Sequence, residues 1–85
     1  MPRMRVSPNP FGSRARLQFE LEQRGQVSCR VFDVTGSQVA VLADLEMNAG
    51  QHELCWVATE AGPGTYFVEL RTSAGIKCAR LVKAQ

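Results

Sequence analysis

Residues 15–31, ARLQFELEQRGQVSCRV, contain two successive runs in which apolar and polar side chains alternate. In Leu17–Leu21 and again in Val27–Val31 every odd-numbered residue is apolar, and Arg24-Gly25 stands between the runs. Alternation with a period of two is typical of a half-buried β-strand, because successive side chains point to opposite faces. A glycine supplies the positive φ that a chain reversal needs. The stretch therefore predicts two strands joined by a short turn.

The same alternation continues along the chain, in residues 51–56 and 66–71. Residues 39–47 are also expected to form a strand, because Val39-Ala40-Val41-Leu42 opens with β-branched side chains and no helix N-cap precedes it. Clusters of glycine, proline, asparagine and serine separate the runs and place strand starts near residues 4, 15, 26, 38, 51, 64 and 76. Seven short strands at this spacing predict an all-β fold, an antiparallel sandwich or barrel.

Length and composition limit the classes of protein to consider. Eighty-five residues suffice for a single domain, expected over residues 1–85, and 45% hydrophobic with 21% charged residues excludes a disordered tail. No apolar run is longer than Val39–Ala43, which is too short to cross a bilayer, so we expect no insertion into a membrane. Residues 1–9 hold two arginines, two prolines and no apolar segment, so no signal peptide is expected. The chain is thus expected to be cytosolic as written or a fragment of a longer protein.

Charge is unevenly distributed, although the net charge is only +2 and does not argue for a nucleic-acid partner. Residues 1–24 carry five arginines against two glutamates, residues 25–60 one arginine against five carboxylates, and residues 61–85 four basic residues against one glutamate. Two explanations stay open: attraction between the terminal and central strands, or a basic patch that meets an anionic partner.

The three cysteines, Cys29, Cys55 and Cys78, are widely spaced and accompanied by a single histidine. This pattern does not suit a zinc site. We expect all three to be free thiols that behave as small buried hydrophobes, with one disulfide plus one free thiol as the alternative.

Candidate catalytic residues are few, and neither a catalytic, a cofactor nor a metal site is predicted. His52 alternates with apolar residues on a strand, which favours a half-buried structural histidine, and no nucleophile is paired with it. Glu20 and Glu22 resemble the polar face of a strand more than an acid–base pair. Three further carboxylates could offer oxygen ligands to calcium, but they do not form the dense loop that calcium needs: Asp33, Asp44 and Glu46.

Four short motifs have structural interpretations. Pro8-Asn9-Pro10-Phe11 is stiff, because each proline fixes φ, and Phe11 is expected to cover one end of the core. Residues 33–36 form a turn in which Asp33 accepts backbone N–H bonds and Gly36 takes a positive φ.

Two glycines are expected to start strands. Gly50 leads through Gln51 into the strand that contains His52 and Trp56, and Gly64 precedes Tyr66, whose ring we expect to be buried with its hydroxyl group hydrogen-bonded.

The order and spacing of these motifs resemble a known family over residues 5–83. The segments that carry the resemblance are VSPNPF (6–11), VFDVTGSQV (31–39), AGQHELCW (49–56), GTYFVEL (64–70) and the basic terminal stretch 77–83. Together they are similar to the type A C-terminal sorting domain of the type IX (Por) secretion system, and to the related Ig-like domain of flagellar hook-capping proteins. The resemblance implies a seven-stranded antiparallel Ig-like β-sandwich.

The resemblance also implies a non-catalytic recognition module rather than an enzyme. Such domains end exported proteins of Bacteroidetes and allied bacteria, which pass through the periplasm and leave across the outer membrane to the cell surface or beyond. The implied partners are proteins, the outer-membrane translocon and sortase-like components. The basic terminal strand is the region that the family ties to recognition, and it maps here to Lys77, Arg80, Leu81, Val82 and Lys83.

The chain departs from the sorting family at Gly12, Val57 and Thr65, and Thr65 is closer to the flagellar relatives. A second function therefore stays open at this point: an Ig-like structural or adhesive module that associates with itself, for instance through edge strands, or packs on a neighbouring domain.

Overall fold

A computed structural model describes residues 3–84, which form seven strands; none of the described residues forms a helix that could span a membrane. The strands are β1 (Arg3–Ser7), β2 (Arg14–Leu21), β3 (Gly25–Asp33), β4 (Gln38–Met47), β5 (Gly50–Val57), β6 (Gly64–Thr72) and β7 (Gly75–Lys83). Every strand begins within one residue of the position that the turn residues predict. Residues 39–47 belong to a strand, β4, as expected.

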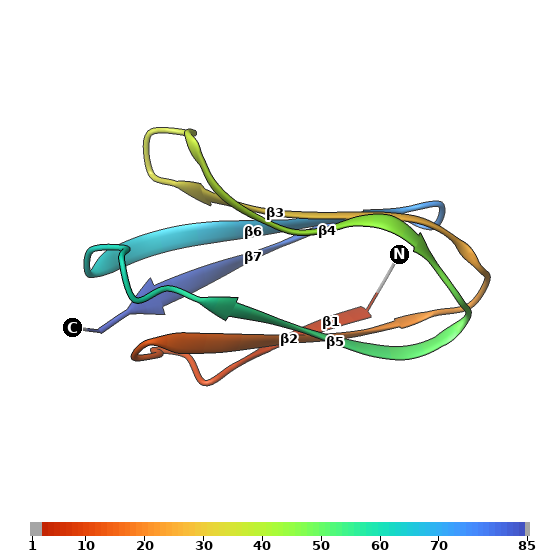
Figure 1. Cartoon of the computed structure of the whole chain (residues 1–85), viewed down its shortest axis with the longest axis horizontal. Helices are drawn as coiled ribbons and strands as arrows, with labels where there is room; N and C mark the ends of the chain where they lie inside the picture. The colour runs from red at the N-terminus through yellow and green to blue at the C-terminus, as the bar shows by residue number, and fades with distance from the viewer. Residues whose placement is uncertain (1–2, 85) are drawn as a thin grey trace.

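The strands form two antiparallel sheets that face each other, as Figure 1 shows. One sheet has the order β1-β2-β5 and the other β4-β3-β6-β7. β4 pairs with β3 rather than with β5, so it belongs to the larger sheet. In constant-type Ig domains the fourth strand belongs to the other sheet instead. The prediction of a seven-stranded antiparallel Ig-like sandwich is confirmed.

The core lies between the sheets and follows the period of two. In β2 the side chains alternate strictly between exposed and buried, and in β3 Val27, Cys29 and Val31 are fully buried. On β6, which is next to β3 in the same sheet, the buried side chains are those of Tyr66, Val68 and Leu70. Burial of each large apolar side chain contributes about 1.5–3 kcal/mol to folding, so these layers hold the two sheets together.

The cysteines follow their position in the strand rather than their residue type. Cys29 is buried, and this burial raises the pKa of its thiol to about 12. Cys55 and Cys78 are exposed, because they occupy outward positions opposite Arg16 on β2 and Glu69 on β6. The expectation of buried thiols is therefore right for one cysteine and wrong for two. All three thiols are free in the structure, so the alternative with one disulfide is also wrong.

The charged segments lie at opposite sides of the sandwich. The terminal strands β1 and β7 lie beside each other at one side, and β4 and β5 lie beside each other at the other. The ion pairs among residues 3–84 are Arg24–Glu46, Arg30–Asp44 and Arg71–Glu69. Only the first joins a basic terminal segment to the acidic middle of the chain. Attraction between terminal and central strands is therefore not the general rule, and a basic side faces away from an acidic one.

Candidate functional site

Most of the motif residues gather at one end of the sandwich. This end, which we call the motif end, consists of the connections 8–13, 34–37 and 58–63 together with the last residues of β7; it lies at the left of Figure 1. The opposite end consists of the connections 22–24, 48–49 and 73–74. Among the predicted motif residues, only Gly50 and His52 belong to the opposite end.

Asn9 ties the connection after β1 to the outer edge of β7. Its side-chain amide donates to the carbonyl oxygen of Arg80 at 3.0 Å, and its side-chain oxygen accepts the backbone N–H of Val82 at 3.0 Å. The side chain thus replaces a neighbouring strand, because it satisfies one acceptor and one donor along the edge. The peptide bonds before Pro8 and Pro10 are both cis.

Phe11 continues this attachment with its backbone. Its N–H donates to the carbonyl oxygen of Val82 at 2.9 Å, and its carbonyl oxygen accepts the N–H of Ala84 at 2.8 Å. We call Pro8–Phe11 the strap, because it runs along the C-terminal half of β7 and pairs with it. The prediction that Phe11 covers one end of the core is confirmed: its side chain is 1% exposed and its ring centroid lies 5.6 Å from that of Trp56.

Tyr66 completes the aromatic cluster of the motif end. Its ring packs edge-on against Trp56 with centroids 5.1 Å apart, and its hydroxyl group donates to the carbonyl oxygen of Gly62 at 2.6 Å. A tyrosine near the start of the sixth strand that bonds a few residues back is the tyrosine corner of Ig-like sandwiches. Gly64, which lies between Gly62 and Tyr66 in the sequence, starts β6 with φ of 138°. The predicted burial and bonding of Tyr66 are confirmed.

The Asp33 turn closes the β3–β4 hairpin. One carboxylate oxygen of Asp33 accepts the hydroxyl and the N–H of Thr35 and the N–H of Ser37. The bond from the Thr35 hydroxyl is the largest of the effects that hold the pKa of Asp33 below its usual value. Gly36 has φ of 88°, which favours glycine because other residues rarely adopt it. The sequence interpretation of this turn is confirmed.

An open hollow lies between this hairpin and the 58–63 connection. Asp33, Val39 and Glu60 are among its lining residues, whereas the basic residues of β7 are not. The hollow therefore does not include the residues that the family resemblance ties to recognition.

His52, at the opposite end, has a structural position. Its Nε2 lies 2.7 Å from the carbonyl oxygen of Asn48, and its ring packs near Phe19 with centroids 5.6 Å apart. Among the described residues no group of three or more histidine, cysteine or carboxylate side chains is placed to hold a metal ion. Glu20 lies on the exposed face of β2, and Glu22 lies just beyond that strand.

The five residues predicted for recognition all lie on or at the end of β7 but do not form one surface. Arg80 is exposed and Val82 half-buried on the outer face, whereas Lys77, Leu81 and Lys83 belong to the opposite face of the strand. Leu81 is 2% exposed and Lys83 8% exposed. Leu81 is thus part of the core and reaches no partner while the domain is folded.

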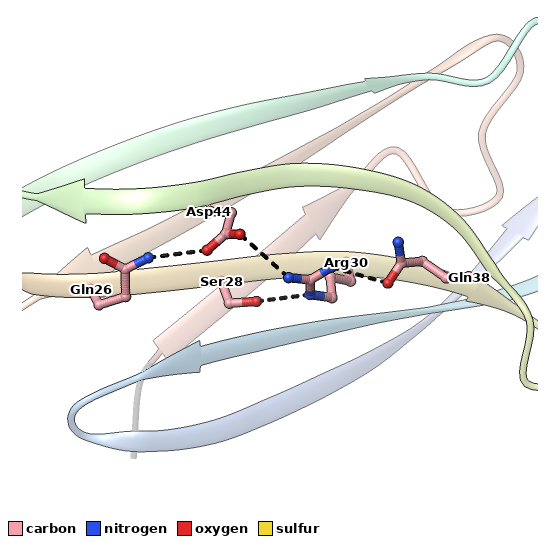
Figure 2. Close-up of polar contacts among 5 residues, drawn as sticks. All are labelled: Gln26, Ser28, Arg30, Gln38 and Asp44. Carbon is pink, nitrogen blue, oxygen red and sulfur yellow. Dashed lines mark hydrogen bonds and ion pairs between the residues drawn. The ribbon is translucent and has the colours of Figure 1, made fainter.

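A polar network on the outer face of β3 and β4 was not among the predicted sites (Figure 2). Its centre is Arg30, which donates to Ser28, Gln38 and Asp44 at 3.1, 3.1 and 3.5 Å, while Gln26 donates to the other carboxylate oxygen of Asp44. Period two in the sequence places residues 26, 28 and 30 on one face, but the partners on β4 depend on two register shifts. The network forms part of the solvent-facing surface of the hairpin, which also includes exposed Val41.

The fold and the motif end define a small Ig-like sandwich whose signature residues hold the strands together at one end. The chain belongs to the family of secretion system C-terminal sorting domains, whose model matches residues 5–84. The domain is a C-terminal sorting signal for type IX secretion, and the protein that carries it is exported to the cell surface or the extracellular space. This membership decides between the two functions that the sequence left open, in favour of sorting.

The fold is also similar to part of a solved structure. The crystal structure of dimeric latent PorU from Porphyromonas gingivalis matches with a TM-score of 0.63 and 16% identity, over 100% of this chain and 9% of that chain. At this identity the similarity supports the fold alone. No curated protein matches the chain in sequence.

Proposed function

We propose that protein components of the secretion machinery recognise this domain in its folded state, through the surface of β7. The implied partners are the outer-membrane translocon and sortase-like components. The domain itself performs no catalysis and meets these partners on the periplasmic side of the outer membrane, before its cargo reaches the cell surface.

One observation carries this proposal: β7 is an edge strand whose charged side chains are all basic. Arg80 is exposed, and Lys77 is half-buried at the sheet edge. The acidic strands β4 and β5 lie at the far side of the sandwich, so they do not neutralise this edge locally. Charges on one side of a small domain steer and orient an oppositely charged partner.

The test is export of a reporter that carries residues 1–85 at its C-terminus, in a bacterium with a type IX system. We expect surface export with the wild-type domain and a strong reduction with Lys77→Glu combined with Arg80→Glu. The matched control is Arg14→Glu with Arg16→Glu, which makes the same charge change at exposed positions on β2. Removing residues 77–85 is a weaker test, because it also removes Leu81 from the core.

Circular dichroism and thermal unfolding of the purified variants check that both remain folded. Equal export by the β7 and β2 variants would contradict a role for the β7 surface. Periplasmic retention of the wild-type fusion would contradict the recognition of this domain altogether.

A further inference from the structure

The outer edge of β7 is divided into two halves that differ in their hydrogen bonds. In the strapped half, residues 80–84, Asn9 and Phe11 bind the carbonyl of Arg80, the N–H and carbonyl of Val82 and the N–H of Ala84. The open half, residues 75–79, precedes it. The strap therefore prevents an added strand from pairing along the C-terminal half of β7.

The backbone groups that the open half presents follow from the alternation of an antiparallel ladder. Residues whose N–H and C=O point away from the neighbouring strand recur every second position. Arg80, Val82 and Ala84 point away from β6, because their groups bind the strap, so Cys78 and Ile76 point the same way. Within the described residues, no turn or loop backbone bond reaches the outward groups of these two residues. The open half thus offers the outward backbone groups of two alternate residues, Ile76 and Cys78, for pairing.

β4, the other edge of the same sheet, offers a poorer template. Its pairing with β3 has register shifts near Arg30 and Phe32. Bulges of this kind twist an edge and interrupt regular pairing. Pairing of β7 with β6, in contrast, is regular from Gly75 to Lys83. An extended partner segment of about five residues would continue the larger sheet most regularly at the open half of β7.

Charge selects which segment fits. Lys77 lies on the same face of β7 as Leu81 and is half-buried, so a strand added at this edge would bury more of its side chain. An inward-pointing lysine on an edge strand discourages pairing with neutral or basic strands, because its charge would be desolvated without a partner. A carboxylate on the added strand would compensate that charge, and exposed Arg80 favours the same sign.

A second copy of this edge does not fit these requirements. Two open halves paired antiparallel about Cys78 would set Arg80 of one copy opposite Ile76 of the other. They would also bring both Lys77 side chains to one face without a carboxylate from either strand. Like charges close together across a strand pair are destabilising.

We infer that the open half of β7 is a strand-addition site for an extended, acidic protein segment, and that Asn9 limits this site by occupying the edge next to it. The inference rests on the proposed recognition through β7 and specifies its geometry and the charge of the partner. Main-chain hydrogen bonds supply affinity in such a mode, and side chains at alternate positions supply selectivity.

The experiment uses a six-residue peptide of alternating threonine and glutamate, with a glutamine-for-glutamate peptide and a lysine-for-glutamate peptide as controls. Amide signals of the reduced wild-type domain are followed by NMR during titration. We expect slower hydrogen exchange at Ile76 and Cys78, no change at Val82 and Ala84, and about tenfold weaker binding of the glutamine peptide. We expect the lysine peptide not to bind.

Cys78→Pro removes one outward N–H without removing a bond to β6, and Cys78→Ser is its matched control. We expect the proline variant to lose peptide binding and the serine variant to keep it, with thermal unfolding confirming that both are folded. Absence of protection at Ile76 and Cys78 in the wild type, or equal binding of the acidic and lysine peptides, would overturn the inference. If export still depends on Lys77 and Arg80 in that case, the proposed function stands and only the strand-addition site is lost.

Discussion

The two ends of the sandwich are stabilised by different kinds of contact. At the motif end, three buried aromatic rings pack in series, the Tyr66 hydroxyl group makes a part-buried hydrogen bond to Gly62, and Asn9 bonds to Arg80, 71 positions along the chain. At the opposite end, Arg24 binds Glu46 and Asn48 at the surface, with most of both charged side chains exposed. Contacts that exclude water contribute more to stability than contacts that remain in it.

The difference shows what the family motif does. Most motif residues lie at the end of the sandwich where the strap is hydrogen-bonded to β7. The motif therefore helps to fix the position of the strand that we propose for recognition. The opposite end carries only Gly50 and His52 from the motif, and its ion pair is replaceable. We therefore expect substitutions at the motif end to have larger effects than equivalent substitutions at the opposite end.

Tyr66→Ala should have the largest effect. The ring is buried against Trp56, and truncation of a buried aromatic side chain costs about 3–5 kcal/mol because it leaves a cavity. Phe67→Ala is the matched control, since Phe67 is the next residue on β6 but is 40% exposed. We expect that variant to lose less than half as much. Urea denaturation gives both free energies of unfolding, and equal losses would contradict the inward and outward assignment of the two rings.

Asn9→Ala should have the next effect, about 1–2 kcal/mol, because it removes two hydrogen bonds that typically contribute about 0.5–1.5 kcal/mol each. Hydrogen exchange should also become faster at the N–H of Val82. Asn48→Ala removes the same side chain from the opposite end, where it accepts only from exposed Arg24. If both substitutions destabilise equally, Asn9 does not have the bridging role that distinguishes the motif end.

Much of this fold was predictable from the sequence, because alternation fixes which residues face the core. The strand starts, the Asp33 turn and the burial of Phe11 and Tyr66 follow from local patterns and are found in the structure. The outward position of Cys55 was also present in the alternation, because Cys55 stands between Leu54 and Trp56, but a preference for buried cysteine outweighed it in the prediction.

Contacts between segments far apart in the chain were not predictable in the same way. Asn9 and Arg80 are separated by 71 positions, and nothing local to either residue indicates that a side-chain amide will pair with a strand edge. The partners of Arg30 depend on bulges in β4, which shift the register by single residues. The period of two specifies faces, whereas such partners depend on how the sheets are assembled.

Acidification should weaken the motif end through Asp33. Its pKa is lowered in the folded state, chiefly by the Thr35 hydroxyl group, so the ionised carboxylate stabilises the folded protein. That contribution is present above the ordinary pKa near 3.8 and is lost as pH falls through the lower folded value. Asp33→Asn keeps a side-chain oxygen but cannot titrate. We expect the stability difference between wild type and variant to shrink below about pH 4, measured by urea denaturation across pH. A constant difference would exclude this carboxylate as a source of the acid sensitivity.

Arg24→Ala should have the smallest effect, although it removes an ion pair of 2.6 Å and a bond to Asn48. The side chains of Arg24 and Glu46 are 61% and 55% exposed, and such pairs contribute about 0–1 kcal/mol because water and salt compete with them. We expect a loss of about 0.5 kcal/mol at low ionic strength that disappears in 1 M salt, where the screening length is about 3 Å. A loss comparable to that of Tyr66→Ala would show that the two ends are held equally firmly and would remove the distinction between them. A loss that persists in high salt would show that the Arg24 contact does not depend on its ion pair.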